Sequence, residues 1–121
     1  MISGVPEAGD IVIINFNPQA GTEISKRRPG LVISAHSFNK ALGQAWIYPI
    51  TSKTPKHGFH VEIPDDVEGF QLATGPGEVS NVKMEQLRSL DFRSLRAVYA
   101  GKVSSEFLTQ CRSYAIRVLE G

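Results

Sequence analysis

The sequence feature that most constrains the fold is a succession of short, β-branched apolar runs, each ended by Gly, Pro or Asn residues. Runs of this kind, bounded by turn residues, are typical of β-strands. Residues 36–43 could form a turn or two of helix before Gly43 ends it. We expect strands at 10–17, 30–35, 44–51, 59–63 and 97–103, and weaker ones at 78–85 and at 87–92, the last continuing as a short helical piece through Arg96.

One long helix is predicted at the end of the chain, from Ser104 or Ser105 to Glu120. Either serine can cap it, and Glu106 lies in the first turn, where the helix dipole favours negative charge. Apolar residues recur at spacings of three and four and form one stripe, which we expect to pack on the sheet. The stripe consists of Phe107, Leu108, Cys111, Tyr114, Ala115, Val118 and Leu119.

These elements together predict a mainly β, α+β fold: a small antiparallel barrel with a C-terminal helix over one open side. In such a barrel the loops that leave the first, third and fifth strands can meet on one face. The 121 residues form one expected domain, 1–121, large enough to fold without a disulfide or a metal.

The composition, 41% apolar and 21% charged, is that of an ordinary soluble globular protein. Cys111 is the only cysteine, and no Cys/His spacing indicates a metal site, so we expect a cytoplasmic protein without a metal. The amino terminus lacks a signal-peptide pattern and no apolar run approaches about 18 residues, so neither secretion nor a membrane span is expected.

Charge is distributed unevenly, although the net charge is only +1. From Lys26 to His60 there are six Lys or Arg and no acidic residue, whereas Glu62 to Glu78 contains five acidic residues and no Lys or Arg. We therefore expect a locally basic face that suits an anionic ligand.

The cations of "SKRRPGLVIS" precede the second predicted strand. Pro29 restricts the backbone at Arg28, so this guanidinium would project from a rigid base and could hold a phosphate with two parallel hydrogen bonds. Lys26 and Arg27 lie on freer backbone and are predicted to contact a phosphate backbone. A solvated surface loop is the alternative for all three.

The segment "PITSKTPKHG" follows the third predicted strand. Thr51 beside Arg28 would form a donor site for a phosphoryl oxygen, although hydroxyls at strand ends also satisfy backbone groups in turns. The further predicted phosphate contacts in this segment are Ser52, Lys53, Lys56 and His57.

Two other side-chain pairs could carry acid–base chemistry. On a strand, His57 and His60 would face opposite sides, so they are not expected to act together, and His60 is expected to be structural or at the surface. On an extended backbone Lys83 and Glu85 would share a face, either as an ordinary exposed ion pair or as a charge stabiliser and a proton-transfer group.

Three segments together resemble the PemK/MazF family of toxins from bacterial toxin–antitoxin systems. They are "AGDIVIINFNPQAGTEISKRRPGLVIS", "YPITSKT" and "VKMEQLRSLD", and they occur in the family's order over essentially the whole chain. This resemblance implies a barrel of the SH3-like, CcdB/MazF type. It also implies a homodimeric RNA endonuclease that needs neither a metal nor another cofactor.

By the same resemblance, Arg28 and Thr51 match the positions that the family uses for cleavage. Lys83 and Glu85 match an Arg and Asp pair with acid and base roles in some members, and Thr22 replaces a histidine that others use. We therefore expect cleavage of single-stranded RNA by attack of the 2'-hydroxyl, leaving a cyclic phosphate and a 5'-hydroxyl. Glu85 is the expected general base.

The resemblance also implies a separately encoded antitoxin, through which alone the protein would contact operator DNA. Two alternatives remain: a CcdB-like topoisomerase poison that catalyses nothing, and a non-catalytic binding module for RNA or protein. Trp46 is expected in the core or at the dimer interface rather than as a platform for base stacking.

Overall fold

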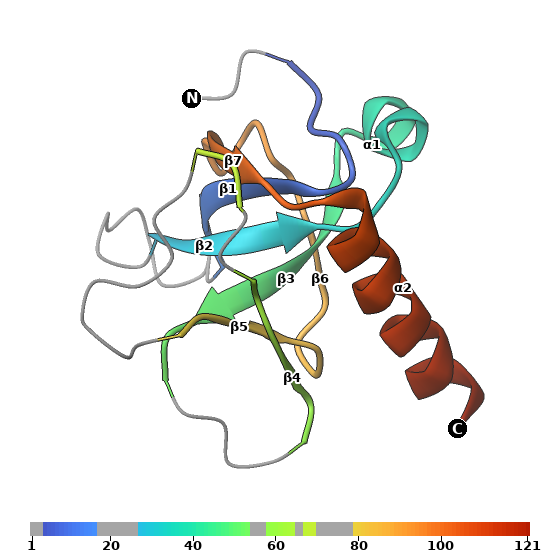
Figure 1. Cartoon of the computed structure of the whole chain (residues 1–121). Coiled ribbons are helices and arrows are strands. Elements are labelled where there is room, and N and C mark those ends of the chain that lie inside the picture. Colours follow the sequence, from blue (N-terminus) through green and yellow to red (C-terminus); the bar gives the residue numbers. More distant parts are fainter. Residues whose placement is uncertain (1–3, 17–26, 54–57, 65–66, 70–78) are drawn as a thin grey trace.

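The computed structural model describes residues 4–16, 27–53, 58–64, 67–69 and 79–121 (Figure 1). The expected strands and both helices are present, so a mainly antiparallel sheet followed by a C-terminal helix is confirmed. The elements are β1 (Asp10–Asn15), β2 (Arg27–Val32), α1 (His36–Leu42), β3 (Ala45–Thr51), β4 (His60–Glu62), β5 (Asn81–Lys83), β6 (Arg88–Leu90), β7 (Val98–Lys102) and α2 (Ser105–Glu120).

The sheet has the strand order β4-β5-β3-β2-β1-β7, with β6 paired to β3. Strand β3 joins the two parts, because residues 45–47 pair with β6 and residues 50–51 pair with β5. The sheet is curved but not closed into a barrel by strand pairing (Figure 1). Among the described residues, a single bridge from Glu68 to Lys102 connects the chain after β4 to β7.

Alternation along the strands divides the buried apolar side chains into two clusters, one on each side of the sheet. The cluster under α2 contains Ile11, Leu31, Tyr48 and Val82 together with Phe107 and Cys111 of the helix. The second cluster contains Val12, Ile14, Phe16, Val32, Ala45, Ile47, Leu90, Phe92 and Ala97. In β2, a Cβ on Gly30 would lie 2.5 Å from the Ile47 side chain and 2.6 Å from the Phe16 ring, so only glycine fits there.

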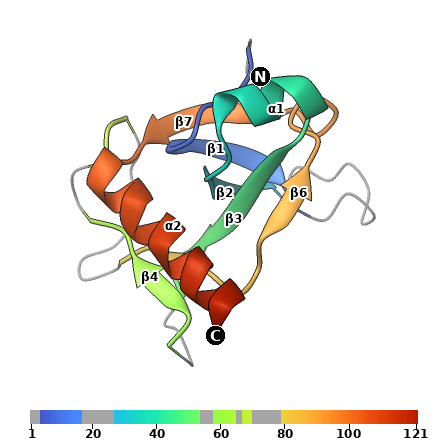
Figure 2. The same ribbon diagram turned by 90° about the vertical axis from the view of Figure 1, so that its right-hand side faces the viewer.

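Helix α2 begins where the sequence predicts, because the Ser104 hydroxyl accepts a hydrogen bond from the Phe107 N–H at 3.1 Å. It lies across the sheet in Figure 2. The predicted apolar stripe is wrong at its end, because Val118 and Leu119 are 56% and 86% exposed where the helix extends past the strands. No helix in the described ranges is long and apolar enough to cross a membrane.

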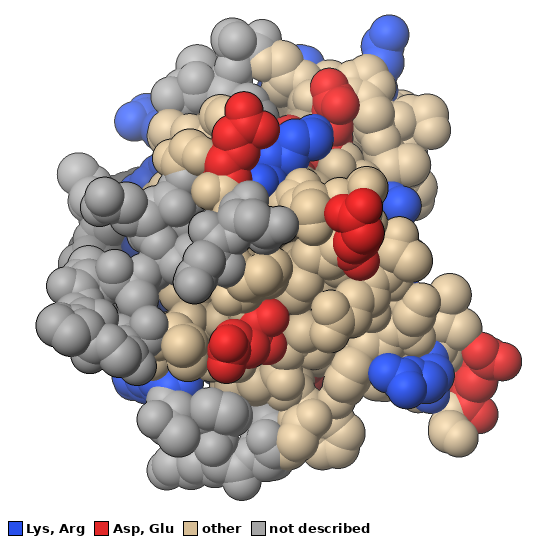
Figure 3. All heavy atoms as spheres, in the orientation of Figure 1, with Lys and Arg blue, Asp and Glu red and all other residues tan. Residues whose placement is uncertain are grey.

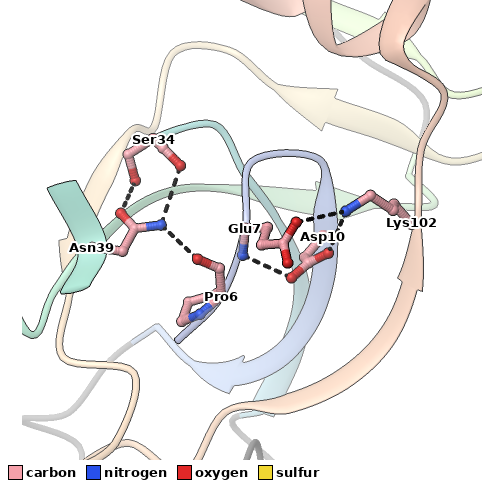
Figure 4. Close-up of polar contacts among 6 residues, drawn as sticks. All are labelled: Pro6, Glu7, Asp10, Ser34, Asn39 and Lys102. Carbon is pink, nitrogen blue, oxygen red and sulfur yellow. Dashed lines mark hydrogen bonds and ion pairs between the residues drawn. The ribbon is translucent and has the colours of Figure 1, made fainter. Parts of the chain in front are cut away.

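One end of the sheet is fastened by buried polar side chains, shown in Figure 4. Asn39 of α1 is fully buried, and its Nδ2 donates to the carbonyl oxygens of Pro6 at 3.0 Å and of Ser34 at 3.1 Å. The Ser34 hydroxyl donates to Asn39 Oδ1 and accepts from the Trp46 N–H at 2.9 Å. These bonds attach α1 and the N-terminal segment to the edge of the sheet.

A second group at the same end surrounds Asp10, the first residue of β1. Its carboxylate accepts from the Glu7 N–H at 2.8 Å and from Lys102 Nζ at 3.1 Å. Partial burial disfavours the charge on Lys102, but the hydrogen bond to Asp10 and the charges of Asp10 and Glu7 outweigh it and raise the pKa of Lys102. We call Pro6, Glu7, Asp10, Ser34, Asn39 and Lys102 the clamp.

Candidate functional site

At the opposite end of β2 and β3 lies a cavity of about 400 Å³. Its polar lining consists of Arg28, Thr51, Ser52, Lys53, Ser80, Lys83 and Gln86. Its apolar lining consists of Phe16, Pro29, Pro49 and Ile50. Among the described residues that line it, three are cationic and none is acidic, so the cavity favours an anion. In the described part of the chain, no group of His, Cys, Asp or Glu is gathered as metal ligands would be.

Arg28 lies within strand β2, which begins at Arg27 rather than at residue 30 as the sequence predicts. The strand begins earlier because Arg27 and Arg28 continue the antiparallel ladder with β1, opposite Asn15 and Ile14. Pairing of β2 with β3 places Gly30 opposite Pro49. Continuing this register by two residues brings Arg28 opposite Thr51, and both side chains line the cavity.

The Thr51 hydroxyl can both accept a hydrogen bond within a turn and donate one to a phosphoryl oxygen, the two roles that the sequence leaves open. Its Oγ1 accepts a hydrogen bond from the Lys53 N–H at 3.1 Å, as expected for a turn. An accepted bond uses a lone pair of the hydroxyl oxygen and leaves its hydrogen for donation. The turn therefore fixes the oxygen at the cavity wall in a way that still permits donation to a phosphoryl oxygen.

Arg27 does not line the cavity, although it is the neighbour of Arg28. Its guanidinium donates to the carbonyl oxygens of Ile13 at 2.9 Å, Leu95 at 3.2 Å and Arg96 at 2.5 Å. Arg96 has a left-handed backbone, with φ of 53°. Arg27 thus stabilises the turn after β6, and its predicted contact with RNA stays a prediction.

Lys83 is the last residue of β5 and Glu85 lies in the turn that follows, so the extended backbone expected for the pair does not continue to Glu85. Strand β5 ends at Lys83, and the Gln86 N–H donates to the Lys83 carbonyl at 3.1 Å, which closes a turn through Met84 and Glu85. Lys83 lines the cavity. The Glu85 carboxylate lies 3.6 Å from Nε2 of His60, which is the cross-strand partner of Lys83. The His60 side chain is only 7% exposed, which agrees with a structural position.

The described cations of the basic segment occupy more than one part of the molecule. Arg28 and Lys53 reach the cavity, whereas Lys40 is exposed on α1 near the clamp, and the third cavity cation, Lys83, comes from a later part of the chain. On the face in Figure 3, Lys and Arg gather mainly near the edges of the view. The predicted contacts Lys26, Lys56 and His57, as well as Thr22, lie outside the described residues.

Sequence reasoning missed several residues of the cavity. Gln86 belongs to the quoted segment "VKMEQLRSLD" and could have been selected from it, but Ser80 and Phe16 carry no signal in the sequence. Cys111 is fully buried, and burial raises the pKa of its thiol to about 12. At neutral pH this thiol is therefore a packing group rather than a nucleophile.

Comparison with protein families gives a match over residues 7–119 to the family described as the PemK-like, MazF-like toxin of type II toxin-antitoxin systems. The endoribonuclease toxin MazF of Escherichia coli strain K12 is 28% identical over 118 residues, which cover 97% of this chain and 96% of that protein.

Solved structures agree with this match. A crystal structure of MazF from Deinococcus radiodurans superposes with a TM-score of 0.75 at 33% identity, covering 97% of this chain and 98% of that one. A MazE-MazF crystal structure from the same organism gives a TM-score of 0.74 at 29% identity, covering 96% of each chain. The fold type expected from the sequence is thereby confirmed.

Proposed function

Because the chain belongs to the PemK-like, MazF-like toxin family of type II toxin-antitoxin systems, we propose that it is an endoribonuclease toxin that cleaves single-stranded RNA and inhibits translation. The observation that carries the proposal is the cavity, where Arg28, Thr51 and Lys83 converge from three separate strands. Two cations and a hydroxyl on one wall are the groups that a phosphodiester requires.

The proposed reaction uses the 2'-hydroxyl of the RNA as nucleophile. Its oxygen attacks the adjacent phosphorus in line, the bond to the 5'-oxygen of the next nucleotide breaks, and the products are a cyclic phosphate and a 5'-hydroxyl. One proton leaves the 2'-hydroxyl and one reaches the departing 5'-oxygen. The step requires neither a water molecule nor a metal ion, and DNA lacks the nucleophile.

Each cavity residue supplies a distinct part of this reaction. Arg28 on β2 donates two parallel hydrogen bonds to the non-bridging oxygens, and Thr51 opposite it donates a third. Lys83 adds positive charge as negative charge develops on the phosphoryl group. Lys53 and Ser52 at the end of β3 hold the neighbouring backbone phosphate, together with the predicted contacts Lys26, Arg27, Lys56 and His57.

Proton transfer is assigned to Glu85, with Lys83 as its cationic neighbour. Glu85 lies on the turn that follows Lys83, one residue before Gln86, and both of these neighbours line the cavity. RNA bound over Lys83 would bring the 2'-hydroxyl toward this turn, and catalytic hydrogen bonds often tighten only once substrate is bound.

The proposal is tested with a long single-stranded RNA and a DNA of the same sequence, each incubated with the protein in excess chelator. We expect discrete fragments from the RNA and none from the DNA. RNA that stays intact would overturn the nuclease proposal and favour a protein that only binds its target.

Binding of the uncleaved DNA analogue should weaken steeply with salt, because phosphate contacts release counterions.

We also infer that the protein forms a homodimer. Supporting this is an apolar cavity of about 380 Å³ between α1, β3 and α2, beside which Trp46 is 43%, Ile116 is 54% and Leu119 is 86% exposed. Apolar surface of this kind is characteristic of interfaces. Sedimentation of wild type and of Ile116→Asp would test it, with a dimer expected for the wild type and a shift toward monomer for the variant.

The inferred protein partner is a cognate antitoxin, through which alone the toxin reaches operator DNA, and the inferred location is the cytoplasm. Support comes from the similar MazF chain crystallised together with MazE and from the cationic cavity, which would attract an acidic segment. An antitoxin segment bound there should compete with RNA, so adding RNA analogue should displace it.

A further inference from the structure

The His60 imidazole and the Glu85 carboxylate lie close together, between β4 and the turn after β5. Nε2 of His60 lies 3.6 Å from Oε1 of Glu85, and the two side chains are 7% and 31% exposed. The imidazole is therefore nearly sealed from solvent, whereas the carboxylate remains accessible to a ligand.

The backbone holds these two side chains in place from both strands. His60 is the direct cross-strand partner of Lys83, and the Met84 N–H donates to the Phe59 carbonyl at 3.0 Å. The Met84 side chain is buried in the core under α2, so the turn is anchored at its second residue. Glu85 is the third residue of this turn, two positions after the cavity residue Lys83.

This arrangement is better suited to a histidine that orients the Glu85 carboxylate than to a histidine that transfers the proton itself. A carboxylate has two oxygens and about four lone-pair sites, so contact of Oε1 with His60 is compatible with proton acceptance by the same group. A long side chain at the tip of a turn otherwise samples several rotamers, and fixing it near its reactive geometry lowers the entropic cost of reaction.

We propose that His60 is a positioning residue, which holds the Glu85 carboxylate in the orientation that accepts the proton of the 2'-hydroxyl. Its burial prevents His60 from touching RNA, so it acts through Glu85 alone. The inference rests on the proposed function, since it states how the base of that reaction is oriented.

The test is a double-mutant cycle on purified, folded protein, with thermal unfolding recorded for each variant. His60→Leu fills the volume of the imidazole without its polar atoms and should lower kcat by about 10 to 100-fold with KM unchanged. His60→Gln retains an N–H donor at similar reach and should recover most of this loss. In a Glu85→Gln background, His60→Leu should have no further effect. His36→Leu on the exposed start of α1 is the matched control and should cleave normally.

Three results would overturn the inference while leaving the nuclease proposal intact. They are an unchanged kcat in folded His60→Leu, an equal loss of kcat with and without Glu85, and normal cleavage by Glu85→Gln. A nuclear Overhauser contact between the His60 ring and the Glu85 γ protons reports the pairing without cleavage. If this contact is present but the wild type cleaves no RNA, the proposed function itself is wrong.

Discussion

The two ends of strands β2 and β3 use polar residues in opposite ways. At the clamp, Asn39 is fully buried, and the structure satisfies it internally with partners from the N-terminal segment and from the segment that follows β2. At the cavity, Arg28 and Lys83 face an open space, and among the described residues neither forms an ion pair with an acidic side chain. Buried polar groups that are satisfied internally stabilise a fold, whereas converging charges without internal partners indicate a site for an external ligand.

The sharpest test of this contrast is Arg28→Ala, which removes charge stabilisation at the cavity. We expect cleavage to fall by about 100 to 1,000-fold, because one preorganised donor to a developing charge contributes that much. Thermal unfolding should change little, since Arg28 is exposed. Arg93→Ala, at an exposed arginine of the turn after β6, is the control and should cleave normally. Equal rates for both variants would remove the distinction between Arg28 and an ordinary surface cation.

The clamp should show the reverse behaviour. Asn39→Ala leaves buried partners at Pro6 and Ser34 unsatisfied and should lower the free energy of unfolding by about 2 to 3 kcal/mol. Urea unfolding measures this, and cleavage per folded molecule should stay normal at low temperature. Ser89→Ala removes an exposed hydrogen bond to Gln44 and should change stability by less than about 0.5 kcal/mol. A loss of cleavage in folded Asn39→Ala would contradict the separation of the two ends.

Thr51 tests whether a residue can serve the turn and the site together. Thr51→Val keeps the shape of the side chain but removes the hydroxyl, so kcat should fall by about 10 to 100-fold, as for loss of a hydrogen bond to a charged group. Thr51→Ser keeps both the bond accepted from Lys53 and the donated one and should retain most activity. If the Val and Ser variants were equally active, the Thr51 hydroxyl would contribute only to the turn and not to cleavage.

The smallest expected effect lies in the core, at Cys111. Burial raises the pKa of the folded Cys111 thiol to about 12, above the ordinary thiol value of 9.0. Above about pH 9 the thiol ionises in the unfolded chain but not in the folded one, which favours unfolding. The stability that the buried thiol contributes is therefore fully present below about pH 9 and is lost as the pH rises toward 12. The unfolding free energy of the wild type should thus decline between pH 8.5 and 10.5 more than that of Cys111→Ala, as measured by urea titration at matched salt. Parallel curves would show that this thiol is accessible to solvent.

Strands and helices were predictable because their patterns are local. Turn residues delimit the apolar runs, and Ser104 with Glu106 marks the start of α2. The convergence of Arg28 and Thr51 was also predictable, since both lie at strand ends that an antiparallel arrangement brings together.

Other features depend on tertiary contacts that no local pattern contains. Arg27 and Arg28 are neighbours of identical type, yet one binds three backbone carbonyls and the other lines the cavity. The contact between Glu85 and His60 depends on the pairing of β4 with β5, which no local pattern predicts. Similarly, Leu119 continues the helical stripe in sequence but lies beyond the sheet that would bury it.

The central claim is that the RNA's own 2'-hydroxyl attacks the phosphate held at the cavity. The most direct test replaces the single nucleotide 5' to a mapped cleavage site by its 2'-deoxy form, in an otherwise unchanged RNA and in excess chelator. We predict that cleavage at this site disappears, while unmodified RNA yields a cyclic phosphate and a 5'-hydroxyl. Persistent cleavage at the deoxy position, or fragments that carry a 5'-phosphate, would contradict the mechanism.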